Sequence, residues 1–341
     1  MRRFSVFALI AAAFVASTSI TARADNRQYI LATATTGGTY YPVGVAIATL
    51  SKIRLEPEYG FSLSAISSAG SGENVKLMRD GEAQFAILQG LYGAWAATGT
   101  GQIANDGPQQ NLRSISMLWR NVEHFVLRAE DAKTGTISDL KNLGKPFSMG
   151  KRNSGSEGSA LHILAALGIE PGTDFDTINL GYGPSADAMQ DNKAAGMNTP
   201  AGVPVSAVTR AFAAANGDLV VLGFTDEQIA AINTALSDDS ALWSRFDIPA
   251  DTYPGQIAPV ATIAQPNFLA VNADVPEEDV YALTKALYEN LPFLAGIHAA
   301  TRDMALENAI DGLPLPLHPG AMRFFSEAGL AIPDRLIARS E

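Results

Sequence analysis

The stretch TATTGGTYYPVG, residues 33–44, joins an apolar run to an amphipathic one. Residues 29–35, which overlap its start, are typical of a strand. Apolar residues within 43–53 recur every three or four positions, which is typical of a helix. A helix start presents free N–H groups and the positive end of the helix dipole. Because this stretch connects a strand to a helix start, it is a candidate site for an anion.

The composition of the stretch supports that interpretation. Gly38 allows a ligand to approach the backbone closely, and Thr36 and Thr39 supply hydroxyl donors. Tyr40 and Tyr41 are adjacent, so their rings point in different directions. We expect one tyrosine to pack in the core and the other to face the ligand, and the sequence leaves open which.

Two further segments, 67–74 and 150–158, follow the same plan of strand, small polar or glycine residues, and helix. A single segment of this kind is most often only a helix cap. Three in one chain point more strongly to a site for a carboxylate or phosphate. None matches the P-loop pattern, and none matches the dinucleotide-binding pattern of glycines after a strand.

Strand and helix patterns alternate along the chain, which predicts an α/β fold with mostly parallel sheets and ligands at the carboxyl ends of strands. Ser71 and Thr225 are the expected helix caps. The expected strands are 29–35, 61–66, 84–88, 112–119, 124–128, 146–150, 177–180, 194–197, 219–222 and 260–271, and the expected helices are 43–53, 71–80, 91–97, 155–167, 225–236 and 276–291.

The N-terminus has the pattern of a secretory signal peptide: two arginines, an apolar run over 4–16, and the cleavage pattern Ala-Arg-Ala at 22–24. We expect cleavage after Ala24 and a periplasmic protein. Removing the three arginines of residues 1–24 changes the formal net charge from −11 to −14. Nucleic-acid binding needs a basic surface, so it is not expected.

The sequence shows no catalytic motif. The four histidines lie far apart, neither H-E-x-x-H nor G-x-S-x-G occurs, and there is no cysteine. We therefore expect a binding protein with no cofactor and no metal. An exported hydrolase with an unrecognised site is the less favoured alternative.

Several blocks resemble the TAXI family, the solute-binding components of one class of TRAP transporters (tripartite ATP-independent periplasmic transporters). Residues 33–50 resemble that family's GTGGTxGxYYPxG signature. Residues 72–101 are similar to its ENL…GEADLALVQ stretch, and 140–169 to its DLKGKRVSVG…GSGT segment. The run LENAIDGLPLPLHPGAMRFFSEAGL resembles its C-terminal part.

The resemblance implies a type II periplasmic-binding-protein fold, with two α/β lobes joined by crossing strands and a ligand cleft between them. Lobe 1 is then 25–124 plus 257–341, and lobe 2 is 125–256. The implied ligand is a small organic anion of the dicarboxylate, 2-oxoglutarate or glutamate type. The implied partner is a TRAP membrane permease that the closed, loaded protein contacts transiently, and we expect a monomer. A sensor that docks on a receptor instead remains an alternative.

The resemblance also places the ligand contacts. The chain departs from the family pattern at "GMNTPAG", residues 196–202, and at Arg152, which leaves the identity of the ligand open. The candidate binding residues are Thr36, Gly38, Thr39, Tyr40, Tyr41, Ser71, Asn74, Gln89, Arg152, Asn153, Ser154, Gly155, Ser156, Asn198 and Thr199.

Overall fold

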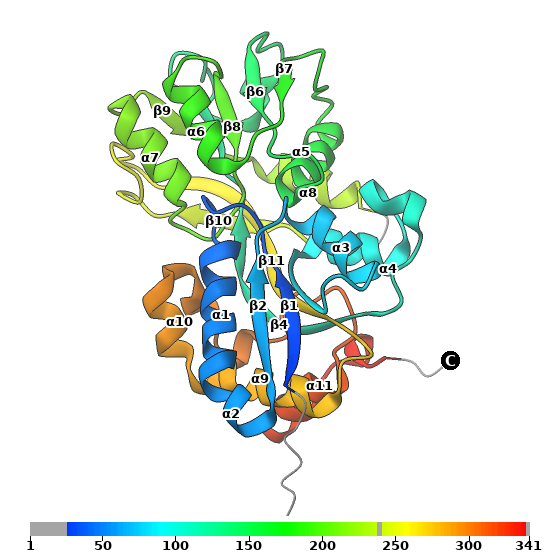
Figure 1. The fold of residues 1–341 in the computed structure, drawn as a ribbon. Helices are drawn as coiled ribbons and strands as arrows, with labels where there is room; N and C mark the ends of the chain where they lie inside the picture. The colour runs from blue at the N-terminus through cyan, green and yellow to red at the C-terminus, as the bar shows by residue number, and fades with distance from the viewer. Residues whose placement is uncertain (1–25, 237–240, 339–341) are drawn as a thin grey trace, which may run out of the picture.

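The computed structural model describes residues 26–236 and 241–338. The predicted signal peptide and its cleavage site lie outside the described residues. Within those residues, no helix combines the length and the apolar character that crossing a membrane requires. Two lobes, each built around one sheet with helices packed on it, form the molecule (Figure 1).

The first sheet has the strand order β10-β11-β3-β1-β2, with β4 also paired to β11. Its central strand β3 is buried along its whole length. The strands are β1 (Arg27–Ala32), β2 (Phe61–Ile66), β3 (Phe85–Gln89), β4 (Leu112–Val122), β10 (Ser244–Ile248) and β11 (Val260–Asn272), and the helices of this lobe are α1 (Tyr40–Arg54), α2 (Glu56–Tyr59), α3 (Ser71–Arg79), α4 (Gly90–Thr98), α9 (Glu277–Glu289), α10 (Leu291–Ile297) and α11 (Pro319–Glu327).

The second sheet has the order β7-β6-β8-β5-β9 and forms the upper lobe in Figure 1. Its strands are β5 (Phe125–Arg128), β6 (Pro146–Ser148), β7 (Asp176–Ile178), β8 (Gly196–Asn198) and β9 (Leu219–Val221), and the helices are α5 (Gly155–Ala166), α6 (Tyr182–Gln190), α7 (Ser206–Ala215) and α8 (Asp226–Thr234). The short 3-10 helices are η1 (Gly101–Asp106), η2 (Ile137–Leu140), η3 (Ala299–Asp303), η4 (Leu306–Asn308) and η5 (Asp334–Leu336).

The α/β class is confirmed, but the expectation of mostly parallel sheets is wrong. β1 pairs in parallel with β2 and β3, whereas β11 runs antiparallel to β3, β4 and β10. In the second sheet β6 pairs in parallel, and β5 is antiparallel to both neighbours. β11 in the first sheet and β5 in the second run against the parallel strands of their sheets, so both sheets are mixed.

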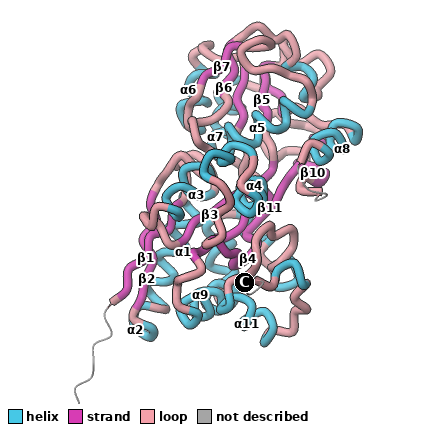
Figure 2. The backbone as a smooth tube through the Cα atoms, turned by 90° about the vertical axis from the view of Figure 1, so that its right-hand side faces the viewer, coloured by secondary structure: helices cyan, strands magenta, loops and turns pink. Residues whose placement is uncertain are grey.

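The chain crosses between the lobes beside two long strands. β4 ends in the first sheet at Val122 and β5 begins in the second at Phe125. At this crossing the N–H of Glu123 donates to the carbonyl of Ile263 in β11 at 2.9 Å. Figures 1 and 2 show β10 and β11 running between the lobes. The lobe boundaries at residues 124/125 and 256/257 stay a prediction. β10 lies within the predicted lobe 2 but pairs with β11 in the sheet of lobe 1.

One predicted helix cap forms and the other does not. Thr225 and Gln228 make the reciprocal bonds of a capping box at the start of α8. The N-cap of α3 is Gly70 and not Ser71. The hydroxyl of Ser71 instead accepts from the N–H of Gln89 at 3.1 Å, which ties the start of α3 to the end of β3.

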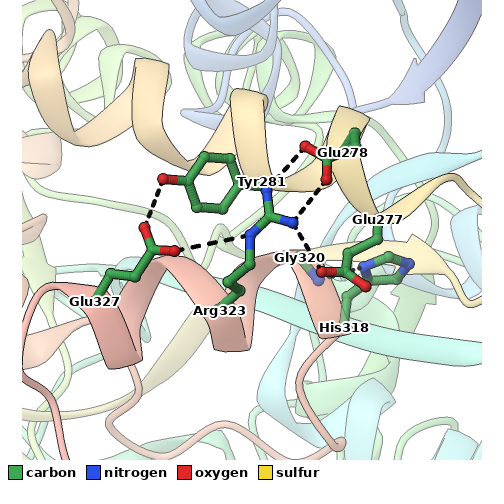
Figure 3. Close-up of polar contacts among 7 residues, drawn as sticks. All are labelled: Glu277, Glu278, Tyr281, His318, Gly320, Arg323 and Glu327. Carbon is green, nitrogen blue, oxygen red and sulfur yellow. Dashed lines mark hydrogen bonds and ion pairs between the residues drawn. The ribbon is translucent and has the colours of Figure 1, made fainter.

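Charged residues link α9 to α11 in lobe 1 (Figure 3). Arg323 of α11 pairs with Glu277 at 3.0 Å and Glu278 at 2.7 Å, both in the first turn of α9. Its guanidinium lies 3.9 Å from the ring centre of Tyr281, whose hydroxyl donates to Glu327. Because several partners share one arginine, this network fixes the helix pair that supports the first sheet from below.

Candidate ligand-binding site

Five helices begin around one small cavity between the lobes. Residues at or just before the starts of α1, α3, α4, α5 and α6 line it. Its volume is about 30 Å³. The lining residues are Ala34, Thr35, Gly38, Thr39, Tyr40, Ala69, Gly70, Ser71, Gln89, Gly155, Ser156, Tyr182, Pro200 and Ala201.

Tyr40 forms the wall contributed by α1. It is 8% exposed, and its hydroxyl donates to Oδ1 of Asn267 in β11 at 2.5 Å. Its ring meets the indole of Trp119 edge to face at 5.9 Å. Burial raises the pKa of Tyr40 well above its usual value, so the phenol keeps the proton that it donates to Asn267. Tyr41 is half-buried and is not among the lining residues.

Ser71 and Gln89 line the cavity from the carboxyl ends of β2 and β3. The Gln89 amide lies against Gly155 of the other lobe, where an added Cβ would meet its side-chain atoms at 2.7 Å. Its Oε1 is buried and has no partner among the described residues. The amide therefore spans the gap between the lobes and keeps an acceptor free.

The second lobe contributes Ser156 and Tyr182. The Ser156 hydroxyl donates to the phenol oxygen of Tyr182 at 3.0 Å, and that phenol donates to the carbonyl of Pro200. Burial raises the pKa of Tyr182 above its usual value. The phenol thus remains protonated and holds the loop after β8 against the start of α5.

The electrostatics of the cavity come from backbone groups, because none of its lining residues is Asp, Glu, Lys, Arg or His. The N-caps of α1, α3, α4 and α6 make no side-chain cap bond. Two first-turn N–H groups already have other partners: that of Leu91 in α4 donates to Gln265, and that of Glu73 in α3 donates to Asn153. Positive helix ends with free N–H groups favour an anion.

Unpaired buried polar atoms surround the same region. Trp119 Nε1, Asn198 Oδ1, Thr199 Oγ1 and Asn267 Nδ2 have no hydrogen-bond partner within the described part of the chain. Leaving such an atom buried and unpaired costs about 1–3 kcal/mol. Buried polar atoms gather in this way where a protein binds a polar ligand.

The lobes touch directly around the cavity, so the arrangement is closed. The Thr39 hydroxyl donates to the carbonyl of Gly202 at 3.2 Å, and the Glu73 N–H donates to that of Asn153 at 2.9 Å. Two more bonds cross the cleft, from the Tyr92 hydroxyl to Ser154 O and from the Ser206 hydroxyl to Gly37 O. Glycines at these contacts permit the close approach: a Cβ on Gly72 would lie 2.6 Å from Asn153 O.

The predicted site residues divide into two groups by their placement. Those that the structure brings to the cavity are Gly38, Thr39, Tyr40, Ser71, Gln89, Gly155 and Ser156. Asn198 and Thr199 are fully buried beside the lining residue Pro200, and Asn198 Nδ2 donates to the carbonyl of Ser156.

The other predicted residues do not line the cavity. Thr36 faces a separate, outer hollow, and Asn153 another one. Asn74 is fully buried, and its amide donates to the carbonyls of Thr33 and Ile87.

Two further predicted residues of the second lobe have local partners. The Ser154 hydroxyl caps α5 by accepting from the Glu157 N–H. The side chain of Arg152 is 79% exposed and lies 3.8 Å from the Glu157 carboxylate, so it does not supply a cation to the cavity.

Sequence reasoning missed Tyr182, Asn267 and Trp119. Tyr182 follows the strand pattern 177–180 within Gly-Tyr-Gly-Pro, which is a fourth segment of strand, glycine and helix start. That pattern was available in the sequence. Asn267 and Trp119 lie inside long strands, and only the pairing of β4 with β11 brings them to Tyr40. No local signal marks them.

Two solved structures, those of MatC and of a Bordetella bronchiseptica protein, share the fold of this chain. MatC from Rhodopseudomonas palustris, solved with bound malate, has a TM-score of 0.53 at 13% identity, over 88% of this chain and 97% of that one. A protein from Bordetella bronchiseptica has a TM-score of 0.50 at 14% identity, over 90% and 85%. The periplasmic aliphatic sulphonate binding protein SsuA from Escherichia coli has a TM-score of 0.44 at 14% identity, over 88% and 90%.

The sequence itself matches one family model along most of its length. The match runs from residue 31 to residue 329 and includes every segment that lines the cavity. The protein therefore belongs to the NMT1-like family and shares its two-lobed fold with MatC.

Proposed function

We propose that this protein is a periplasmic solute-binding protein that captures a small organic anion between its lobes by hinge closure. The observation that carries the proposal is the convergence of five helix starts on one cavity between the lobes, lined by no charged side chain. Helix N-termini and hydroxyls bind carboxylates without a cation from the protein.

The proposed ligand class is a dicarboxylate such as malate or 2-oxoglutarate. Helix starts on both lobes face the cavity, so a carboxylate at each end of one molecule could bind both lobes at once. Glutamate is the less favoured member of the class, since an ammonium group needs acceptors and the lining contains no carboxylate.

The proposed partner is a TRAP-type membrane permease, which receives the ligand from the closed protein. This step rests on the resemblance of residues 33–50, 72–101 and 140–169 to the TAXI family. Binding and not catalysis is the proposed activity. Among the described residues, His298 is the histidine within hydrogen-bond reach of a lining hydroxyl: its Nε2 lies 3.5 Å from that of Thr39, which itself donates to the carbonyl of Gly202 and not to the imidazole.

A thermal-shift panel tests the ligand class. The mature protein is heated with succinate, malate, 2-oxoglutarate, glutamate or ethanesulfonate, and with succinamide as the uncharged counterpart of succinate. A ligand present at 100 times its Kd should stabilise the folded state by about 2.7 kcal/mol. We expect a shift with at least one dicarboxylate and none with succinamide. A panel in which no carboxylate shifts the midpoint would overturn the proposed ligand class.

A further inference from the structure

One carboxyl group is buried at the crossing between the lobes. Glu123 lies between β4 and β5 and is 0% exposed. Its backbone is held by β11 through the bond to Ile263 O and through the Thr262 hydroxyl, which donates to Glu123 O at 2.9 Å. The position of the carboxyl is therefore fixed by the strands that connect the lobes.

Among the residues that the structure describes, the groups that act on this carboxyl are hydrogen-bond donors and not cations. The Ser159 hydroxyl donates to Oε2 at 3.3 Å. N–H groups of Trp243 and Gln265 lie close enough to lower the pKa, but burial outweighs them and raises the pKa of Glu123 to about 8. Oε1 has no hydrogen-bond partner among the described residues. A carboxyl group with that pKa holds its proton at neutral pH.

Glu123 lies directly behind the cavity. Its partner Ser159 is in α5, one turn after Ser156, which lines the cavity. The charge of an ionised Glu123 raises the pKa values of Tyr40 and Tyr182, two lining phenols on opposite lobes. A negative charge inside the cavity would interact with Glu123 through the same buried medium.

Within the described part of the chain, the histidines near Glu123 and the cavity do not compensate that charge. Burial lowers the pKa of His298, whose Nε2 lies 3.5 Å from the Thr39 hydroxyl. His124 is fully buried, its Nε2 lies 2.7 Å from the Tyr253 hydroxyl, and burial lowers its pKa to about 4. His162 stacks on Trp243, and burial lowers its pKa as well. These imidazoles are neutral where Glu123 titrates, so two negative charges would face each other without a counterion.

We propose that Glu123 couples ligand binding to proton uptake, because an anion can occupy the cavity only while the Glu123 carboxyl holds a proton. The inference rests on the proposed function. At a pH where Glu123 is ionised in the ligand-free protein, a buffer acid transfers one proton to a carboxylate oxygen of Glu123 when the anion binds. Affinity for the anion then falls as pH rises, by up to about tenfold per pH unit.

The test is isothermal titration calorimetry of the mature protein with malate, 2-oxoglutarate and glutamate. Each titration is run one pH unit below and one above the pKa of Glu123, in two buffers with different ionisation enthalpies. For malate or 2-oxoglutarate we expect weaker binding at the higher pH. At that pH the heat of binding should depend on the buffer and report the uptake of nearly one proton per ligand bound. Glu123→Gln should bind with an affinity that is the same at both pH values and with no proton uptake.

Glu157→Gln is the matched control. Like Glu123→Gln it replaces one carboxyl group by an amide, but it does so in the first turn of α5. Glu157 is bound by the Asn153 N–H and by Asn179, away from Glu123. This variant should keep the pH dependence of the wild type.

Three results would overturn the inference. Dicarboxylate binding with equal affinity at both pH values and no proton uptake would show that Glu123 does not sense the ligand. Glutamate binding that strengthens as pH rises would show that an ionised Glu123 instead pairs with an ammonium group. If none of the three ligands binds at either pH, the proposed function fails and the inference fails with it.

Discussion

A methyl group added at Gly72 should block closure of the lobes. Gly72 is in the first turn of α3, and a Cβ there would lie 2.6 Å from the carbonyl oxygen of Asn153 on the opposite lobe. An ordinary contact begins at 3.4 Å, so the lobes must separate by about 0.8 Å at this point. The neighbouring bond from Glu73 N–H to the same oxygen, 2.9 Å long, would then exceed hydrogen-bond length.

The size of the effect follows from that lost bond. One hydrogen bond contributes about 1 kcal/mol, and 1.4 kcal/mol corresponds to a tenfold change in affinity. Gly72→Ala should therefore raise the Kd for the dicarboxylate at least about fivefold. The stability of the ligand-free protein should change little. Alanine is favoured over glycine in a helix by about 1 kcal/mol, which offsets the tight 3.2 Å contact of the added Cβ with Tyr92 Cε1 in the same lobe.

Calorimetric titration with the dicarboxylate that gives the largest thermal shift measures the effect. Gly296→Ala in α10 is the matched control, because an added Cβ there meets no atom within 4 Å. It should bind like the wild type. An unchanged Kd in Gly72→Ala would refute the reasoning, because it would mean that the ligand-bound protein does not bring α3 and Asn153 together.

Three further predictions concern single side chains. Tyr40→Phe removes the donor to Asn267 and should weaken dicarboxylate binding at least about fivefold, as measured by calorimetry. Tyr41→Phe is the control and should leave the affinity unchanged. Equal effects of the two substitutions would refute the assignment of Tyr40 to the cavity. Arg152→Ala should leave affinity unchanged, because that side chain is 79% exposed, and a clear loss would return it to the site. Glu123→Gln should flatten the pH dependence of unfolding, because the native pKa of about 8 exceeds the ordinary 4.5 and the native state therefore holds the proton more tightly. The wild-type free energy of unfolding should fall as pH rises from about 4.5 to about 8, by at most about 5 kcal/mol at 1.36 kcal/mol per pH unit. Urea unfolding measured across that range would contradict this prediction if both proteins showed the same slope of stability against pH.

Much of the fold could be predicted from local patterns. The buried spacing of Val43, Ile47 and Leu50 produces α1, and the capping box at Thr225 produces α8, because both depend on neighbours in the sequence. Mixed strand directions could not be predicted, since they depend on β11 pairing with β3 and β4 across long stretches of chain.

The candidate site was predictable to a similar degree. Glycine and hydroxyl residues before helices led to Thr39, Tyr40, Ser71 and Ser156, which line the cavity. Glu123 escaped notice because an isolated glutamate after a strand looks like an ordinary surface residue, and only the packing of both lobes buries it.

The most direct test of the central claim is a crystal structure of the mature protein grown with the dicarboxylate that gives the largest thermal shift. We predict closed lobes, with the ligand carboxylates within hydrogen-bond distance of the first N–H groups or hydroxyls at Ser71 and Ser156 and of the Tyr40 phenol. A dicarboxylate bound elsewhere on the molecule, such as beside the exposed Arg152, with none between the lobes would contradict the account.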